Sequence, residues 1–366
     1  MDSSAADIID LSGAPVPWSP EAEAIWADCI GQAARTADLW TTPAPRGDEV
    51  IREWIAADQG FDPEQVTIVS SLRAAALTYA RCFDHVIVEQ PSFLGVMPAL
   101  ASARAQVQTM PWSEIFEGTL GTEASRTVLW LTSPGRNPDG ASLSPAGEAA
   151  LRRRAATGYR VVINATYTWF TELRAPAGFD VLGSLHKLRG GGARLGWVAS
   201  ASFFDEAVPE LVGTPPSPVW QRAWGLFLRD GGMALLRGTY LADVAAATSA
   251  FASRLTSAHG IAPPAFAGPS VLVPLTAPAA PASEDAAVAE FARQGFKLVA
   301  GRHFMSRYPA IRATFFGVTP EQAARFADAL AASGRLAVDD GCHGGKSAIE
   351  NASWPAVSPA AVEREA

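Results

Sequence analysis

The feature that most constrains this chain is the alternation of short apolar runs with longer segments at helical spacing. The runs, rich in β-branched residues, cover 66–70, 86–89, 127–132, 161–164, 180–185 and 197–200. Helical patterns lie between them, over 47–57, from Ser71, after Pro91, and from the N-cap Ser144 through Pro145 to Thr157. Continuous apolar strands separated by helices are typical of a parallel sheet buried on both faces. The sequence predicts an α/β fold, a three-layer sandwich with a mainly parallel sheet.

The pattern changes past residue 265. Segments 268–275, 295–301 and 310–317 have strand character, a helical pattern covers 284–294, and Thr319 to Gln322 has the spacing of a capping box at a second helix. The proline-rich stretch 277–283 is predicted to be a surface loop. This part of the chain predicts a smaller α+β domain.

Composition excludes several classes of function. The 366 residues carry a net charge of −8 without a basic cluster, which disfavours a nucleic-acid partner. The N-terminus lacks the pattern of a signal peptide, and no apolar run reaches the length of a membrane span. Cys29, Cys82 and Cys342 are scattered, and the five histidines show no metal-binding spacing. We expect a soluble cytoplasmic protein with no metal and no membrane partner.

The stretch SLHKLRGGGARLGW, residues 184–197, places a lysine at the end of a predicted strand. A phosphate-binding P-loop has its lysine after the glycines, so the order here disfavours nucleotide triphosphates. Lys187, followed by small residues and Arg194, suits a Schiff-base lysine beside a phosphate. A glycine turn with an exposed lysine is the alternative interpretation of this stretch alone.

Two further stretches put polar side chains at strand ends. SPGRNPDG, residues 133–140, follows the run 127–132 and carries Asn137, although Asn-Pro-Asp-Gly is also a common turn. VVINATYTWF, residues 161–170, changes from an apolar run to Asn164 and Tyr167. Because ligands bind at the carboxyl ends of strands in open α/β sheets, both stretches are candidate parts of a site.

Taken in order, these stretches resemble the fold type I pyridoxal-phosphate (PLP) enzymes, and specifically the class I/II aminotransferase superfamily. The matching motifs are VSSLRAA (69–75), QPSF (90–93), NPDG (137–140), INATY (163–167), SLHK (184–187), ARLGW (193–197) and AIRATF (310–315). The resemblance covers roughly residues 10 to 335. It implies the PLP-dependent transferase fold, with a large PLP-binding domain over 45–250. A small domain with an N-terminal strap is then expected over 1–44 and 251–338, and a weakly ordered tail over 339–366.

The resemblance implies a role for each matching residue. Lys187 would form the Schiff base with PLP and carry a proton, and Arg312 would grip the substrate α-carboxylate in a bidentate manner. Gly13 matches the glycine of the strap that closes over substrate. The remaining matches are cofactor ligands: Phe93 stacking on the pyridine ring, Asn137 and Tyr167 bonded to its 3′-oxygen, and Ser184, Arg194 and the helix start at Ser71 and Leu72 bound to the phosphate.

The chain departs from the family pattern at several positions. Asn164 stands where the family typically carries an aspartate, which keeps the pyridine nitrogen protonated. An amide has no charge to raise the pKa of that nitrogen, so ordinary transamination should slow. Arg194 is one residue closer to Lys187 than is common, and where many relatives have a tyrosine this chain offers only Trp40. His186 before the lysine resembles the His-Lys pair of several decarboxylases and hydroxymethyltransferases, or is a histidine that packs locally.

Three hypotheses follow. The simplest is an aminotransferase that acts on the α-amino group of an amino acid, with a keto acid as partner substrate. The second keeps PLP but makes the protein a lyase, a decarboxylase or a carbon–carbon bond-forming enzyme of specialised metabolism, and Asn164 favours it. The third is a catalytically inactive binding protein with this fold. A nicotinamide-dependent enzyme is disfavoured because the run 66–70 is not followed by GxGxxG. The resemblance also implies a homodimer.

Overall fold

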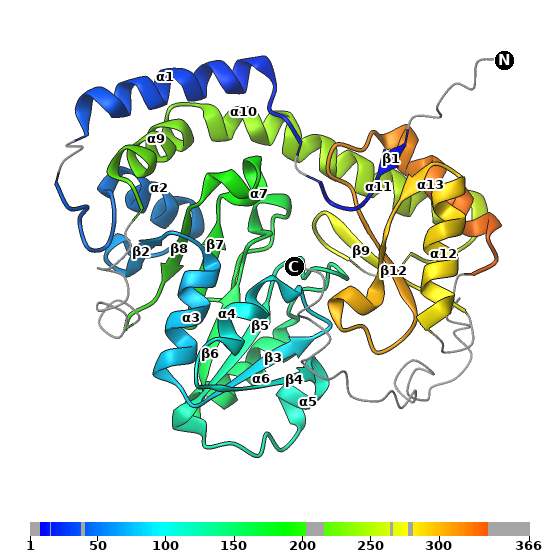
Figure 1. Ribbon diagram of the computed structural model, residues 1–366, viewed down its shortest axis with the longest axis horizontal. Helices are drawn as coiled ribbons and strands as arrows, with labels where there is room; N and C mark the ends of the chain where they lie inside the picture. Colours follow the sequence, from blue (N-terminus) through cyan, green and yellow to red (C-terminus); the bar gives the residue numbers. More distant parts are fainter. Residues whose placement is uncertain are drawn as a thin grey trace.

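The computed structural model describes residues 8–14, 16–37, 41–202, 216–263, 266–276 and 281–335. Its larger sheet has, within this part of the chain, the strand order β2-β8-β7-β6-β5-β3-β4 (Figure 1). The bounds are β2 Val66–Val69, β3 His85–Gln90, β4 Gln106–Pro111, β5 Thr127–Thr132, β6 Arg160–Asn164, β7 Asp180–Ser184 and β8 Gly196–Ala199. Only β8 runs antiparallel to its neighbours β2 and β7, so the predicted mainly parallel sheet is confirmed.

Strand β4 was not predicted from the sequence. Its residues, QVQTMP, are exposed or half-buried, and among the strands of the described residues it pairs with β3 alone, at the edge of the sheet. An edge strand covered on one side lacks the continuous apolar run that marks the central strands.

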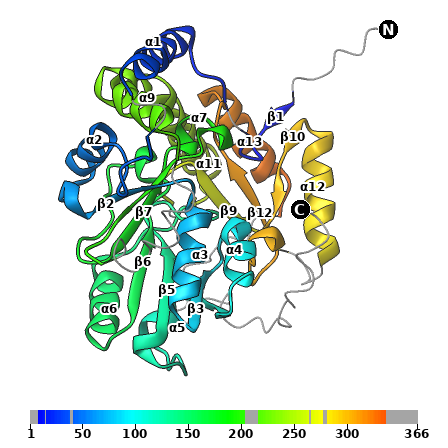
Figure 2. The same cartoon turned by 60° about the vertical axis from the view of Figure 1, so that its left-hand side comes forward.

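Helices cover both faces of this sheet. They are α1 Pro20–Thr36, α2 Glu49–Gln59, α3 Leu72–Cys82, α4 Met97–Ala101, α5 Trp112–Glu117, α6 Pro145–Ala156, α7 His186–Arg189, α9 Pro218–Arg229 and α10 Gly232–Gly238. Short 3-10 turns are η1 Pro63–Gln65, η2 Leu94–Val96, η3 Ala124–Arg126, η4 Thr168–Phe170 and η5 Gly191–Ala193. Leu129 of β5 packs in a core with residues of α1, α2 and α9, whereas Trp130 packs on the opposite face with α3 and α4. The predicted three-layer sandwich is therefore confirmed. Figure 2 shows α1 and α9 side by side outside the sheet.

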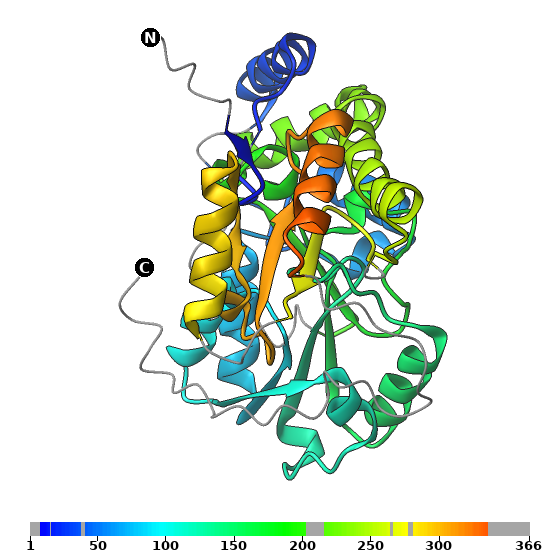
Figure 3. The same cartoon turned by 90° about the vertical axis from the view of Figure 1, so that its right-hand side faces the viewer.

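A smaller sheet with its own apolar core lies toward the C-terminus. Its order is β11-β12-β9, with β9 Ser270–Pro274, β11 Val299–Ala300 and β12 Ala310–Thr314, and β1 Ile9–Asp10 pairs separately with β10 Phe296–Lys297. Helices α11 Tyr240–His259, α12 Pro281–Arg293 and α13 Pro320–Ala332 pack on it, next to the 3-10 turn η6 Gly301–Phe304 (Figure 3). The capping box at Thr319 is present as the sequence predicts.

The prediction of a loop over 277–283 is wrong for its last three residues, because α12 begins at Pro281. Proline is well suited to the first turn of a helix, since its missing N–H has no intrahelical partner there. Residues 277–280, and the predicted weakly ordered tail 339–366, lie outside the described residues. Within the part of the chain that the structure describes, no helix is long and apolar enough to cross a membrane.

Helix α11 contacts both parts of the molecule. Val244 packs with Tyr167, which follows β6, and with Phe316, which follows β12. Phe251 and Leu255, further along the helix, belong to the core of the smaller sheet. The predicted domain boundary at residue 250 falls within this helix, and the division into domains stays a prediction.

The packing of β7 against β8 leads to a stability prediction. A Cβ added to Gly183 would lie 2.2 Å from ring atoms of the fully buried Trp197. Gly183→Ala should therefore lower the free energy of unfolding by at least about 2 kcal/mol, as overpacking does, measured by urea denaturation of the purified protein. Gly238→Ala is the matched control, because nothing lies within 4 Å of its added Cβ. Equal midpoints for the two variants would contradict the packing described.

Candidate active site

The register of the central strands brings three loops together at the carboxyl edge of the larger sheet. Thr132, at the end of β5, is paired with Asn164 at the end of β6, and Asn164 is paired with Leu182 near the end of β7. The segments that follow these strands carry Asn137, Tyr167 and Lys187. These three segments therefore lie at the edge where α/β proteins bind ligands.

Lys187 belongs to the short helix α7, and two aromatic rings lie near its side chain. Its Nζ is 5.1 Å from the centroid of the Tyr167 ring and 5.8 Å from that of Phe93. Tyr167 is buried at 5% exposure, whereas Phe93 is 48% exposed. A Cβ on Gly95 would lie 2.1 Å from the Phe93 ring, so only glycine lets the ring occupy this place. The result is an accessible aromatic platform beside an amine.

The main chain around Lys187 is held by two residues that the sequence reasoning missed. The Tyr240 hydroxyl donates to the Lys187 carbonyl at 3.2 Å, and Trp18 Nε1 donates to the Leu188 carbonyl at 2.6 Å. Burial, and then the neighbouring Tyr167, raise the pKa of Tyr240, so its hydroxyl stays a donor. Neither residue stands in a recognisable motif. These bonds fix the turn that presents the lysine side chain.

Arg312, the residue predicted to bind the substrate carboxylate, is a buried cation on β12 of the smaller sheet. It is 7% exposed, its Nη2 donates to the Ser12 carbonyl at 2.8 Å, and its Nη1 donates to Thr314 Oγ1. Burial lowers its pKa to about 10, so it stays charged at pH 7. The Nε atom is buried without a hydrogen-bond partner among the described residues. The guanidinium therefore keeps an unused donor.

Gly13 and Arg312 are brought together. Gly13 has a φ of +82°, and a Cβ there would lie 3.1 Å from Arg312 Nη1. Both the positive φ and the close approach of the arginine require glycine. The N-terminal segment thus passes directly beside the guanidinium.

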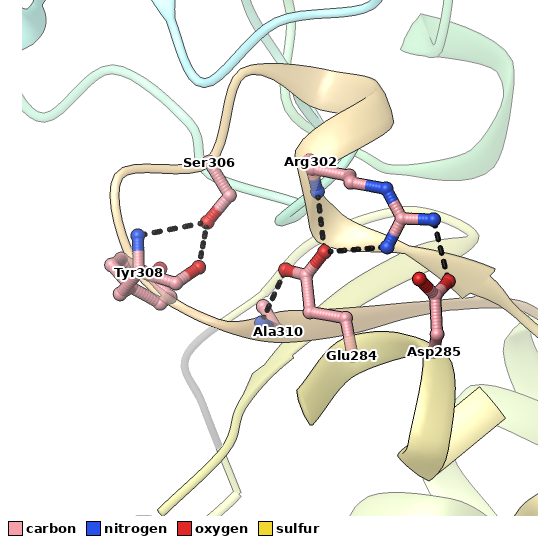
Figure 4. A network of polar contacts seen from close by, with 6 residues as sticks. All are labelled: Glu284, Asp285, Arg302, Ser306, Tyr308 and Ala310. Atoms are coloured by element: carbon pink, nitrogen blue, oxygen red, sulfur yellow. Dashed lines mark hydrogen bonds and ion pairs between the residues drawn. The ribbon is translucent and has the colours of Figure 1, made fainter. Parts of the chain in front are cut away.

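A polar network joins α12 and η6 to the start of β12, the strand that carries Arg312 (Figure 4). The buried Glu284 carboxylate accepts hydrogen bonds from the backbone N–H of Ala310 at 2.9 Å and of Arg302 at 3.2 Å. These contacts tie the start of β12 to the turn η6. Phe304, at the end of η6, lies under the guanidinium of Arg312 with its ring centroid 4.7 Å from Cζ. The Glu284 carboxylate therefore holds the backbone at the start of β12, and the Phe304 ring contacts the guanidinium that this strand carries.

The predicted phosphate ligands lie around α3 and α7. Ser71 is the N-cap of α3, and its Oγ accepts from the N–H of Ala74 at 3.2 Å, while Leu72 begins the helix. Ser184 Oγ lies against His186 Nδ1 and accepts from the N–H of His186 at 3.2 Å. The side chain of Arg194 is exposed. The hydroxyls of both serines are thus engaged locally, and helix α3 offers its first backbone N–H groups.

Arg73 is a cation at this place that the sequence reasoning did not select, although it stands in the motif VSSLRAA. Its Nε donates to the Gly95 carbonyl at 2.6 Å. Burial, the charge of Lys187 and the charge of Arg73 together lower the pKa of His186 to about 3. His186 is therefore neutral at pH 7.

The two predicted asparagines differ in how they are held. Asn137 is buried, and its Oδ1 has no partner among the described residues. Asn164 is half-buried, and its Oδ1 accepts hydrogen bonds from both the N–H and the hydroxyl of Thr166. No group of His, Cys, Asp and Glu side chains in the described ranges is arranged to hold a metal ion.

A buried acidic cluster supports the loop that carries Asn137. Glu89 of β3 is fully buried, accepts from Trp112 Nε1 at 2.7 Å, and lies 3.7 Å from Arg136 Nη1. Arg136 Nε donates to Asp139 Oδ1 at 2.9 Å, and its guanidinium lies over the Trp112 ring. Burial raises the pKa of Glu89 to about 7, although Arg136 and the hydrogen bonds oppose the rise.

The cluster makes stability depend on pH. The pKa of Glu89 rises from an unfolded value of 4.5 to about 7. The contribution of Glu89 to the free energy of unfolding is therefore fully present below pH 4.5. It is lost as the pH rises through 7, and the loss amounts to about 3 kcal/mol. Glu89→Gln cannot ionise and should remove this part of the pH dependence. Chemical denaturation from pH 5 to 8 measures it, and Glu114→Gln, an exposed carboxylate, is the control. Identical pH profiles for wild type and Glu89→Gln would contradict the prediction.

Comparison with solved structures identifies the fold. The aspartate aminotransferase of Thermus thermophilus, solved with maleate, superposes with a TM-score of 0.72 at 18% identity, covering 89% of this chain and 91% of that one. The α-aminoadipate aminotransferase of Thermus thermophilus gives 0.71 at 20% identity, covering 89% and 92%. A PLP-dependent cyclase gives 0.69 at 22% identity, covering 90% and 94%.

No family model matches the chain, and no curated protein matches it by sequence. The structural likeness nevertheless extends over nearly the whole of both chains. The protein has the fold of the PLP-dependent aminotransferases, as the motifs in the sequence predict.

Proposed function

We propose that this protein is a PLP-dependent enzyme that acts on the α-amino group of an amino acid through Lys187, most simply an aminotransferase. The observation that carries the proposal is the place of Lys187 Nζ, within 6 Å of the accessible Phe93 ring and of the buried Tyr167 ring. The fold supports it, since the α-aminoadipate aminotransferase with this fold was solved with a phosphopyridoxyl-leucine ligand.

The residues present fit PLP. The cofactor supplies an aldehyde and an electron-accepting aromatic ring. Phe93 offers the ring a stacking surface, and Lys187 offers the amine that attaches it. Tyr167 and the buried amide of Asn137 are the groups proposed for its ring oxygen. The first N–H groups of α3, at Ser71 and Leu72, are proposed for its phosphate, together with Ser184 and Arg194.

Arg312 is proposed to bind the substrate carboxylate. Its guanidinium is charged, nearly buried, and retains an unpartnered Nε–H. A carboxylate that accepts from a buried guanidinium forms a charge-assisted hydrogen bond, which is stronger than a neutral one. Gly13 leaves room beside the same guanidinium. The strap and Arg312 would together orient the α-carbon of the substrate toward Lys187.

The proposal is tested by loading the protein with PLP and reducing it with borohydride. Peptide mass spectrometry should find the phosphopyridoxyl mass on Lys187, and Lys187→Ala should lose it entirely. Arg189→Ala, which removes a cation from the same turn, is the control and should keep the label. A folded protein that acquires no label would favour the hypothesis of an inactive binding protein.

A second candidate function is favoured by a specific observation, the amide of Asn164 at the end of β6. A lyase, a decarboxylase or a carbon–carbon bond-forming enzyme is compatible with an unusual partner for the pyridine nitrogen, and a PLP-dependent cyclase shares the fold. Incubation with amino acids and a keto acid separates the two. Stoichiometric amino transfer supports an aminotransferase, whereas ammonia, carbon dioxide or a new product without an acceptor supports the alternative.

Replacement of the carboxylate-binding group gives a quantitative prediction. Arg312→Lys keeps the charge but loses the planar fork and its contacts to Ser12 and Thr314. We expect the KM for the amino acid to rise about 10- to 100-fold, because the substrate carboxylate loses a charge-assisted hydrogen bond. Steady-state kinetics measure it, with Arg307→Lys, an exposed ion pair to Glu114, as the control. An unchanged KM would place the carboxylate elsewhere.

We also propose that the active species is a homodimer, as the resemblance to the aminotransferases implies. Sedimentation equilibrium of the protein with PLP bound would show twice the chain mass of 38.5 kDa. A mass that stays at one chain over the whole concentration range would refute this assembly.

A further inference from the structure

The orientation of the Asn164 amide is fixed by Thr166. The backbone N–H of Thr166 lies 3.2 Å from Asn164 Oδ1, and the Thr166 hydroxyl donates to the same atom. A backbone N–H can only donate a hydrogen bond, so the amide atom that faces it must be the oxygen. The two ends of the amide are thereby distinguished by the contacts of the chain itself.

This arrangement leaves Asn164 with a donor to offer. The oxygen is occupied by Thr166, and the Nδ2 atom lies on the other side of the amide. Within the described residues, no hydrogen bond is formed by this Nδ2. The two residues paired with Asn164 in the sheet, Thr132 and Leu182, are not ionisable. The free end of the side chain is therefore an uncharged N–H donor at the carboxyl edge of β6.

We propose that Thr166 is a positioning residue, which holds Asn164 as a hydrogen-bond donor to the pyridine nitrogen of bound PLP and so keeps that nitrogen unprotonated. The inference rests on the proposed function. A pyridine nitrogen accepts from an N–H only through its lone pair, and a protonated nitrogen has none free. An amide oxygen could accept from a protonated nitrogen, but here the oxygen is already bound.

Thr166 is suited to this task. It is buried, and its backbone N–H and its hydroxyl both converge on one oxygen atom. Turning the amide over would place an Nδ2–H group against the backbone N–H and would lose that hydrogen bond, whereas the hydroxyl can also accept from the turned amide. The unwanted orientation is thus disfavoured about 5-fold or more, the loss of one hydrogen bond. An unprotonated ring withdraws electrons from the substrate less strongly, and Lys187 would meet a less acidic substrate α-carbon.

The test is 15N NMR of the full-length protein loaded with PLP labelled at the pyridine nitrogen, with free PLP in acid and in alkali as the two standards. In wild type at pH 7 to 8 the resonance should match an unprotonated nitrogen. Asn164→Asp should move it to the protonated position. Thr166→Ser, which keeps both donors, should behave as wild type. Thr166→Pro, which removes both the backbone N–H and the hydroxyl at the second position of a turn where proline is favoured, should shift the resonance toward the protonated value and raise the pH at which it titrates.

The outcomes separate the inference from the proposed function. If PLP does not attach to Lys187 on borohydride reduction, the proposed function fails. If PLP attaches but the wild-type nitrogen is protonated at pH 7 to 8, only the inference is overturned. If Thr166→Pro gives the wild-type spectrum and titration, Thr166 does not position the amide. Should Thr166→Pro not fold, the comparison of wild type, Thr166→Ser and Asn164→Asp still decides the protonation state.

Discussion

The site depends on the register of three adjacent parallel strands. Because β5, β6 and β7 run in one direction and end at nearly the same level, the segments after Thr132, Asn164 and Ser184 are forced into contact. A shift of β6 by one residue would turn Asn164 to the other face of the sheet. The alternation of Leu129 and Trp130 between two different cores makes such a shift costly for β5 as well. The positions of the polar residues at the carboxyl ends of these strands are thus determined by the packing of the apolar residues within the sheet.

Burial then sets the charge of the groups above the sheet. Desolvation lowers the pKa of Arg312 to about 10, so Arg312 stays charged at pH 7. Desolvation is also the main cause that lowers the pKa of His186 to about 3, so His186 is neutral at pH 7. Glu89, which lies near the loop that carries Asn137, has a pKa of about 7 and is therefore about half ionised at pH 7. The site therefore keeps the positive charge of Arg312, which suits an anionic ligand.

Much of this arrangement could be predicted from the sequence because the information is local. The buried strands show as apolar runs, and Lys187, Asn137 and Arg312 stand in short motifs. Tyr240 and Trp18 could not be found in this way, since each donates to a main-chain carbonyl and any chain segment presents carbonyls. Strand β4 is polar because it lies at an edge. The role proposed for Thr166 depends on the direction in which the Asn164 amide points, although Thr166 itself is in the motif INATY.

The N-terminal segment contacts both halves of the site through hydrogen bonds. Ser12 accepts from Arg312 on the smaller sheet, and a few residues later Trp18 donates to the carbonyl of Leu188, next to Lys187. Movement of the smaller sheet relative to α7 must therefore bend this segment or break one of the two bonds. Arg312, which would hold the carboxylate, and Lys187, which would hold the cofactor, are therefore linked through the N-terminal segment. A change in the position of one should change the position of the other.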